Sequence, residues 1–389
     1  MRNLILLLVL MCVINVWANM FVNIPESSTN ELYTDFGKIK GYYKFPKHGI
    51  LHLLKQSNPS IPQPFKISLS EHKIKQMNNF KDANIIFFNL LVDYRRNYDR
   101  MFKNTKQPNY IYSLLCVDTF ANKASLYSMF QKNASESEVF KYLPITYILD
   151  NKQSYNKLIN EYDTDKLYIL KKNVQRQKGC TITNNEAYIK QAHKNNYVVC
   201  QEVLLDPYTI QGHKINIRQY MLVIVRKSDC EFLLFNDGFL YYTPKKFIKG
   251  SLDKQRHITT GYIDRKIYED NPMTLKELYD YMGKKDSFVL EKNIVRLFKS
   301  VANVYMDHVL ENDTNLHVNF MIFGCDVAVS NTLDCKIMEI NKGPDLSFKD
   351  KRDGAVKHTL GLNTLHEVGI INAPHNNFIP LSYKYKNEA

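Results

Sequence analysis

The sequence lacks several patterns that would assign a class of protein at once. It has no CxxC pair or dense cysteine framework, no Walker phosphate-binding loop, and no zinc-finger or RNA-recognition signature. It has no internal repeat or low-complexity tract, and beyond the N-terminal region no segment is apolar enough to span a bilayer. These absences argue against a disulfide scaffold, a P-loop nucleotide-binding protein and a multi-spanning membrane protein.

The composition is that of a folded protein with a basic surplus. Of the 389 residues, 44% are hydrophobic and 23% are charged, so the chain can bury the cores of two or three domains. The net charge of +13 favours an acidic partner, such as nucleotide phosphates, a glutamate-rich polypeptide, nucleic acid or an anionic membrane. The basic residues are spread along the chain, so no nucleic-acid partner is expected.

Residues 1–19 have the pattern of a signal peptide or signal anchor. Arg2 precedes a short apolar run that ends at Ala18, which suits cleavage and is short for a membrane span of about 20 residues. This pattern predicts the secretory pathway, or membrane association through this segment if it is uncleaved; the alternative is a cytoplasmic protein. Asn133 and Asn312 begin glycosylation tripeptides if the chain is secreted. Six cysteines follow this segment, several of them in apolar strand-like runs, so buried free thiols are expected.

Periodicity and turn residues predict strands first, then helices, then a closing hairpin. This order indicates an α+β, or mixed α/β, fold with antiparallel sheets. The expected elements are an irregular leader at 20–80, strands at 83–92 and 142–150, a helix from Lys123, short strands from Leu167 with a hairpin turn at Asn236–Gly238, a helix opened by the capping box Thr274–Glu277, helices at 289–310 and 353–365, and a hairpin at 320–347.

The hairpin at 320–347 carries three oxygen side chains that suit a metal ion. Asp326 lies on its first strand, while Glu339 and Asn341 are two residues apart on its second strand and share a face. A hairpin brings Asp326 opposite them. Hard oxygen ligands of this kind suit Mg²⁺ held between carboxylates and nucleotide phosphates. The alternative interpretation is a pair of ordinary carboxylates on a solvated strand face.

Basic residues ahead of this hairpin suit phosphate groups. Lys171 ends a strand and is followed by a basic loop with Lys178 and Gly179, whose charge and backbone N–H groups can cover phosphates. A surface β-turn is the alternative for this loop. Lys123 opens a helix, where a cation is unfavourable to the helix dipole and so suggests a ligand.

Two strand segments between these pieces suit the rest of a nucleotide. Residues 201–204 end an apolar strand whose backbone can bond an adenine edge between apolar side chains. Lys214, Asn216 and Arg218 alternate with apolar residues, so all three lie on one face of a strand. That face is equally consistent with the solvated side of an edge strand.

Taken in order, these pieces resemble the tubulin-tyrosine ligase family of the ATP-grasp superfamily, from about residue 80 to residue 370. Residues 122–126, Asn-Lys-Ala-Ser-Leu, are similar to the Arg-Lys-x-x-Leu segment of the family, and residues 143–146 to its Pro-x-Thr strand. Pro207 and Gly212 precede the strand with Lys214 and Arg218 as in the family pattern.

The resemblance implies an ATP-grasp catalytic domain at 166–375, a smaller N-terminal α/β domain at 81–165 and a C-terminal tail at 376–389. It implies ATP- and Mg²⁺-dependent joining of a free amino acid to a polypeptide through an acyl phosphate, with tyrosination, glutamylation and glycylation all open. The implied polypeptide is tubulin or another acidic protein. The implied site residues are Arg218 and Lys123 as catalytic residues; Lys171, Lys178, Gly179, Gln201, Glu202, Val203, Leu204, Lys214 and Asn216 as nucleotide-binding residues; and Asp326, Glu339 and Asn341 as Mg²⁺ ligands.

Three positions depart from the family pattern. Asn216 stands where the family has aspartate, Tyr241 where it has the arginine of Gly-x-x-Arg, and Thr260 where it has asparagine. The loss of the arginine weakens the expectation of an acidic acceptor tail. Two alternatives follow: a non-catalytic nucleotide-binding or interaction protein that retains the ATP-grasp fold, or an ATP-grasp enzyme that acts on a small carboxylate.

Overall fold

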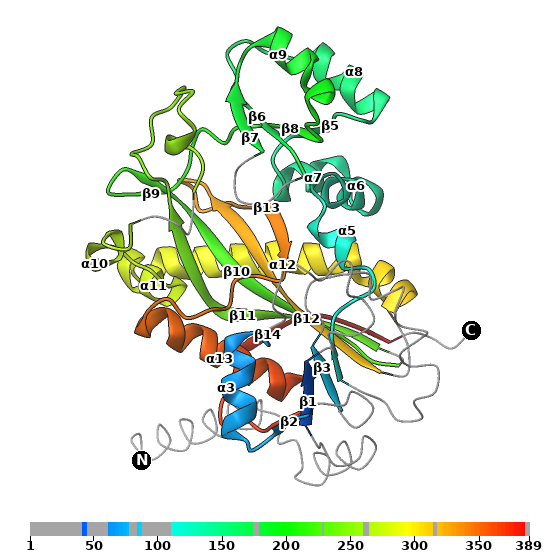
Figure 1. Ribbon diagram of the computed structural model, residues 1–389. Coiled ribbons are helices and arrows are strands. Elements are labelled where there is room, and N and C mark those ends of the chain that lie inside the picture. Colours follow the sequence, from blue (N-terminus) through cyan, green and yellow to red (C-terminus); the bar gives the residue numbers. More distant parts are fainter. Residues whose placement is uncertain are drawn as a thin grey trace, which may run out of the picture.

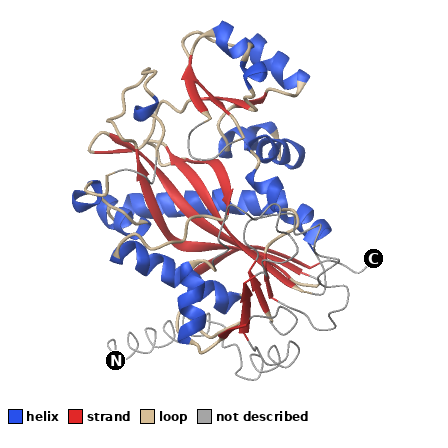
Figure 2. Ribbon diagram, viewed as in Figure 1, coloured by secondary structure: helices blue, strands red, loops and turns tan. Residues whose placement is uncertain are grey.

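The computed structural model describes residues 41–44, 61–77, 84–87, 110–173, 179–227, 229–259, 264–313 and 317–385. Their strands form two sheets, one of ten strands and one of four (Figure 1; Figure 2). The predicted signal segment at 1–19, Lys178 and Thr260 lie outside the described residues.

The larger sheet is mixed. Its strands from β14 to β12, with β13 and β9, pair antiparallel, and those from β12 through β4 to β2 pair parallel. Along the sheet the strands are β14 (Phe378–Tyr385), β11 (Asp229–Tyr242), β10 (His213–Val225), β12 (Val318–Val329), β4 (Tyr110–Tyr112), β3 (Ile85–Phe87), β1 (Gly41–Lys44) and β2 (Lys75–Met77), with β13 (Cys335–Lys342) beside β12 and β9 (Thr209–Ile210) beside β10.

The centre of this sheet is buried on both faces. Residues 221–225 of β10 are consecutive apolar side chains without exposed surface, a pattern typical of a strand covered on both sides. The long helix α12 (Lys284–Asp313) crosses behind these strands in Figure 1 and buries the predicted apolar stripe. Helix α13 (Lys351–Glu367) packs against α3 (Gln63–Glu71), where Gly361 leaves room for Pro64.

The smaller sheet lies apart from the larger one and has its own apolar core (Figure 1). Its order is β5 (Thr146–Ile148), β8 (Val199–Glu202), β6 (Tyr168–Lys171) and β7 (Cys180–Thr183), all antiparallel. The remaining helices are α5 (Val117–Ala121), α6 (Lys123–Asn133), α7 (Glu136–Tyr142), α8 (Lys152–Glu161), α9 (Glu186–Lys190), η2 (Ala192–Asn195), η3 (Lys254–Arg256), α10 (Ile267–Asp270) and α11 (Leu275–Met282).

Several predictions from the sequence are confirmed. The capping box between Thr274 and Glu277 is formed in both directions at the start of α11. The hairpin of β12 and β13 is present, with its turn at residues 330–334. The six cysteines after the N-terminal segment are free, and five of them are buried.

The turn predicted at Asn236–Gly238 is wrong. These residues lie within β11, where the register against β10 shifts, and the chain reverses instead between Val225, the last residue of β10, and Asp229, the first of β11. A Cβ at Gly238 would lie 2.5 Å from the backbone oxygen of Arg218, so close approach of two strands requires this glycine.

The organisation of the chain departs from three expectations. The leader at 20–80 is not irregular where it is described, because it contributes β1, β2 and α3, whose Phe65 and Leu69 are fully buried. The larger sheet is only partly antiparallel. Strands β4 and β5 precede residue 165, but they pair with β12 and β8, which follow it. Each sheet therefore contains strands from both sides of the predicted domain boundary. Across the described ranges, no helix is both long and apolar enough to cross a membrane.

Candidate active site

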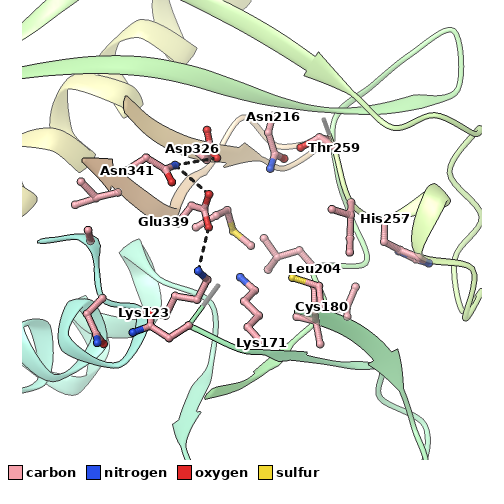
Figure 3. Close-up of a pocket in the computed structure, with 18 of the residues that line it drawn as sticks. Lys123, Lys171, Cys180, Leu204, Asn216, His257, Thr259, Asp326, Glu339 and Asn341 are labelled. Carbon is pink, nitrogen blue, oxygen red and sulfur yellow. Dashed lines mark hydrogen bonds and ion pairs between the residues drawn. The ribbon is translucent and has the colours of Figure 1, made fainter. Parts of the chain in front are cut away.

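A cavity of about 670 Å³ opens where the two sheets face each other. The smaller sheet contributes side chains of β6, β7 and the end of β8, and the larger sheet contributes β10, β12 and β13. The segment from α5 to the start of α6 closes one side, and residues 257–259 close another. Figure 3 shows Lys123, Lys171 and Glu339 pointing into this space from different elements.

The predicted metal ligands meet at one end of the cavity. Asp326 and Glu339 are register partners on β12 and β13, and Asn341 lies two residues beyond Glu339 on the same strand. The Nδ2 atom of Asn341 donates to Oε1 of Glu339 at 2.9 Å and to Oδ2 of Asp326 at 3.5 Å (Figure 3). The hairpin therefore brings the three oxygen-bearing side chains into one cluster.

Arg218 holds the Asp326 carboxylate from the side. Its Nε and Nη2 atoms donate to the two oxygens of Asp326 at 2.6 and 3.1 Å, a bidentate pair between neighbouring strands. Burial raises the pKa of Asp326 to about 6, and Arg218 acts against this rise. Gly324 leaves space for this pair, since a Cβ there would lie 3.2 Å from Nη1 of Arg218 and 2.8 Å from Pro344.

Two lysines face the carboxylates from separate elements. The Nζ atom of Lys123 lies 3.8 Å from Oε2 of Glu339, and Lys171 reaches toward the same carboxylate in Figure 3. Burial opposes ionisation of Glu339, but Lys123 and Lys171, with a hydrogen bond from Asn341, lower its pKa overall. The cluster is therefore held as anions by surrounding cations.

Lys171 and Lys214 are the unusual cations of the cavity. They are only 7% and 5% exposed. Within the described part of the chain neither ammonium has a carboxylate within ion-pair distance. Burial lowers the pKa of both, that of Lys214 to about 8 with Lys171 adding to the effect. Two buried charges that lack anionic partners indicate a site for an anionic ligand.

The donor set of the cluster fits Mg²⁺. Two carboxylates and one amide offer only hard oxygen ligands, and the described residues contain no histidine or cysteine cluster that would favour a softer metal. Each Asp326 oxygen keeps a lone pair beyond its bond to Arg218. Asn341 offers its oxygen to a cation once its amide rotates by half a turn.

The segment predicted to bind adenine is only partly at the cavity. Glu202, Val203 and Leu204 line it, whereas the amide of Gln201 turns away and donates to Thr146 at 2.8 Å. Gly179 lies beside the strand end, where its oxygen accepts from the N–H of Lys172. Arg218 does not line the cavity itself. It is connected to the cavity by its two hydrogen bonds to Asp326, which does line it.

Sequence reasoning missed several lining residues. Cys180 and Ile182 form an apolar wall with Met338, and their spacing of two residues on β7 already places them on one face. Asp118 on α5 pairs with Lys342 at the rim, a contact between residues 224 apart that no local pattern reveals.

Of the three positions that depart from the family pattern, two are described. Asn216 lines the cavity, and its Oδ1 is buried with no hydrogen-bond partner among the described residues. Tyr241 lies outside the cavity, with its ring centroid 5.0 Å from the guanidinium carbon of Arg218.

Comparison with known proteins agrees with this geometry. A model of the tubulin-tyrosine ligase family matches residues 71–377. The chain belongs to the tubulin-tyrosine ligase family. Members of this family are ATP-dependent amino-acid ligases that modify tubulin, and membership implies the ATP-grasp fold.

The similar relatives are distant in sequence. A probable tubulin polyglutamylase of Rattus norvegicus, TTLL9, is 26% identical over 185 residues, which cover 44% of this chain and 38% of the relative. Tubulin glycylase 3B of Drosophila melanogaster is 27% identical over 199 residues, which cover 46% of this chain and 26% of the relative. Tubulin polyglutamylase TTLL6 of Homo sapiens is 22% identical over 268 residues, which cover 63% of this chain and 29% of the relative. The chain thus spans less than two fifths of the length of these relatives.

Proposed function

We propose that this member of the family is an ATP- and Mg²⁺-dependent ligase that joins an amino acid to a polypeptide carboxylate. The observation that carries the proposal is the meeting, in one cavity, of the Asp326–Glu339–Asn341 cluster with Lys171 and Lys214, which have no carboxylate partner among the described residues. Carboxylates that hold a metal ion next to free ammonium groups match what a nucleotide triphosphate requires.

The reaction follows from this arrangement. An oxygen of the acceptor carboxylate bonds to the γ-phosphorus of ATP as the bond to the β,γ-bridging oxygen breaks, which releases ADP. The amine nitrogen of the amino acid then bonds to the acyl carbon. At the same time the bond between the acyl carbon and the phosphate oxygen breaks, which releases inorganic phosphate and a proton. Both steps need positioning and charge neutralisation more than a protein nucleophile.

The residues divide this work by position. Lys171 and Lys214 bind the phosphate chain, while the apolar wall and the backbone of Glu202–Leu204 hold the base. Lys123 and Arg218, at the two sides of the carboxylate cluster, stabilise the charge on the transferred phosphoryl group. Mg²⁺ held by the cluster supplies further charge neutralisation when bound.

The test measures ADP formation and label incorporation together. Full-length protein is incubated with ATP, Mg²⁺, a mixture of labelled amino acids and cell extract, and the labelled polypeptide is identified. Glu339→Gln is expected to reduce both signals at least about 100-fold, because it removes one charge from the cluster without changing its shape. Glu291→Gln, on the exposed face of α12, is the matched control. A Glu339→Gln protein that keeps activity within threefold of the wild type contradicts the proposal.

A non-catalytic nucleotide-binding protein is the second candidate, favoured by the replacements at Asn216 and Tyr241 and by the unpaired Oδ1 of Asn216. It predicts ATP binding without ADP release across amino acids and acidic peptides. An ATP-grasp enzyme for a small carboxylate predicts a small labelled product, which mass spectrometry distinguishes from a modified protein.

The acceptor and the compartment are separate proposals. Tubulin or another acidic protein is the acceptor that the relatives suggest. Residues 1–19 are proposed to direct the chain to the secretory pathway or to a membrane. A mass shift on glycosidase treatment checks this, since Asn133 is exposed at the end of α6. No shift and recovery in the cytosolic fraction favour the cytoplasmic alternative.

A further inference from the structure

The surface next to Arg218, on the side away from the nucleotide cavity, is formed by three parts of the chain. Tyr241 covers the Arg218 guanidinium. Residues 264–282 approach this pair through Tyr268, which donates to the backbone oxygen of Leu240, and residues 343–357 approach it through Pro344, which lies next to Gly324 and Arg218. Arg352 ties the last two segments together by donating to the backbone oxygen of Tyr268 at 2.7 Å. We call these two segments and Tyr241 the charge-paired wall; α10, α11 and α13 mark its position in Figure 1.

Most cations of this wall already have a carboxylate partner. Lys357 is the most buried of them, and its Nζ lies 2.9 Å from Asp353 while also donating to the backbone oxygen of Ser347. Within the described residues, only the exposed Lys266 and Lys351 of these segments have no ion pair. The pairs are Arg265–Asp350, Lys276–Asp237, Lys349–Asp345, Arg352–Glu277 and Lys357–Asp353.

The charge count of the wall differs from that of the whole protein. Residues 264–282 and 343–357 together carry seven Lys or Arg and eight Asp or Glu, a net charge of −1, against +13 for the chain. A surface of this charge repels additional anions rather than attracting them. The basic surplus of the protein therefore lies elsewhere.

At position 241 this chain has a neutral tyrosine where the family pattern has an arginine. Tyr241 is the register partner of Asn216, so two of the three departures from the family pattern lie side by side on β10 and β11. Where the family pattern has an arginine opposite an aspartate, this chain has two neutral side chains. Arg218 is the cation that lies beside Tyr241, and its guanidinium is already bonded to both oxygens of Asp326.

We propose that Tyr241 and the charge-paired wall select an acceptor whose reactive carboxylate has no acidic neighbours. This inference rests on the proposed ligase function and names its acceptor class. An acceptor with several adjacent carboxylates brings anions against a wall of net charge −1, whereas one carboxylate in a neutral segment needs only Arg218. Tyr241 is then a specificity-determining residue for the acceptor.

The experiment compares two fluorescent peptides with the same central glutamate, flanked either by Gly, Ser and Gln or by further glutamates. Binding is measured by anisotropy with a non-hydrolysable ATP analogue and Mg²⁺ at two salt concentrations, and labelled amino-acid incorporation is measured with ATP. We expect the neutral peptide to bind at least about threefold more tightly, with little effect of salt. Tighter binding of the acidic peptide, weakened by salt, overturns the inference.

Substitutions at Tyr241 separate the charge effect from a structural one. Tyr241→Arg is expected to shift the ratio of the two affinities about tenfold toward the acidic peptide, and Tyr241→Lys gives the same direction if the arginine variant unfolds. Tyr241→Phe keeps the ring over Arg218 and is expected to retain the neutral preference. Tyr383→Arg adds the same charge on the exposed surface of β14 and should leave the ratio unchanged. An equal shift in Tyr383→Arg overturns the role of Tyr241.

The two readouts keep this inference apart from the proposed function. Absence of labelled product with both peptides and with cell extract refutes the ligase activity. The ratio of affinities still decides whether the wall disfavours acidic segments.

Discussion

Replacing Lys214 by methionine is expected to stabilise the protein in the absence of nucleotide. The Lys214 ammonium is 5% exposed and has no carboxylate partner in the described part of the chain. A pKa that falls from 10.5 to about 8 corresponds to roughly 3 kcal/mol of unfavourable free energy at pH 7. Relaxation of the site and entry of water reduce this figure, so a gain of about 1–3 kcal/mol is expected for Lys214→Met.

The sign of the pH dependence follows from the direction of the pKa shift. The unfolded chain binds a proton on Lys214 more tightly than the folded chain does, so stability falls as pH decreases from about 10.5 to about 8. Below pH 8 both states are protonated and the penalty is constant. The advantage of Lys214→Met should therefore be largest at pH 7 and decrease to under about 1 kcal/mol at pH 10.

Denaturant unfolding followed by circular dichroism at pH 7 and pH 10 measures this difference. Lys299→Met is the control, because Lys299 is exposed on α12 and its replacement should change the free energy of unfolding by less than about 0.5 kcal/mol. Saturating ATP with Mg²⁺ should reduce or reverse this advantage. Wild type then gains about 2.7 kcal/mol at 100 times its Kd, while the variant binds ATP more weakly and gains less.

Two results would refute this reasoning. One is a Lys214→Met protein that is less stable than the wild type at pH 7 without nucleotide. The other is an advantage that stays the same from pH 7 to pH 10, which would show that packing, not the buried charge, determines the difference.

Three further substitutions test the scaffold of the site. Gly324→Ala should reduce the free energy of unfolding by about 1–3 kcal/mol and impair ligation, because the new Cβ would lie 2.8 Å from Pro344 and 3.2 Å from Arg218; an unchanged melting temperature contradicts this. Asp313→Asn should lower the urea midpoint by the equivalent of about 1–3 kcal/mol, since the carboxylate accepts both backbone N–H groups ahead of α5; wild-type stability would show that one oxygen suffices. Lys336→Met should destabilise by about 1–2 kcal/mol, because its ammonium caps three backbone oxygens at the end of α7; heat denaturation checks this, and no change would mean that water replaces the ammonium.

The carboxylate cluster was predictable because local rules suffice to build it. Alternation along two strands and a polar turn predict a hairpin, and a hairpin determines that Asp326 faces Glu339. The spacing of Glu339 and Asn341 places both on one face without any tertiary information. The helical stripe of α12 and the capping box of α11 follow from equally local patterns.

Features that depend on distant contacts escaped sequence reasoning. Asn-Asp-Gly at 236–238 is a strong turn signal, yet Gly238 is needed because Arg218 approaches it from the neighbouring strand. Strands β1 to β4 have only three or four residues each, too few for a period, and pairing alone makes them part of the larger sheet. Helix α3 is buried by α13, which lies almost 300 residues later in the sequence.

The distribution of charge across the site has a physical consequence for binding. The anions of the site lie on one hairpin and are neutralised in place by Arg218 and Lys123, so they need no ligand to be stable. Lys171 and Lys214 come from different sheets and are buried with no carboxylate partner in the described ranges. Phosphate groups that satisfy both ammoniums would link the smaller sheet to the larger one, so nucleotide binding should rigidify the cavity that receives it.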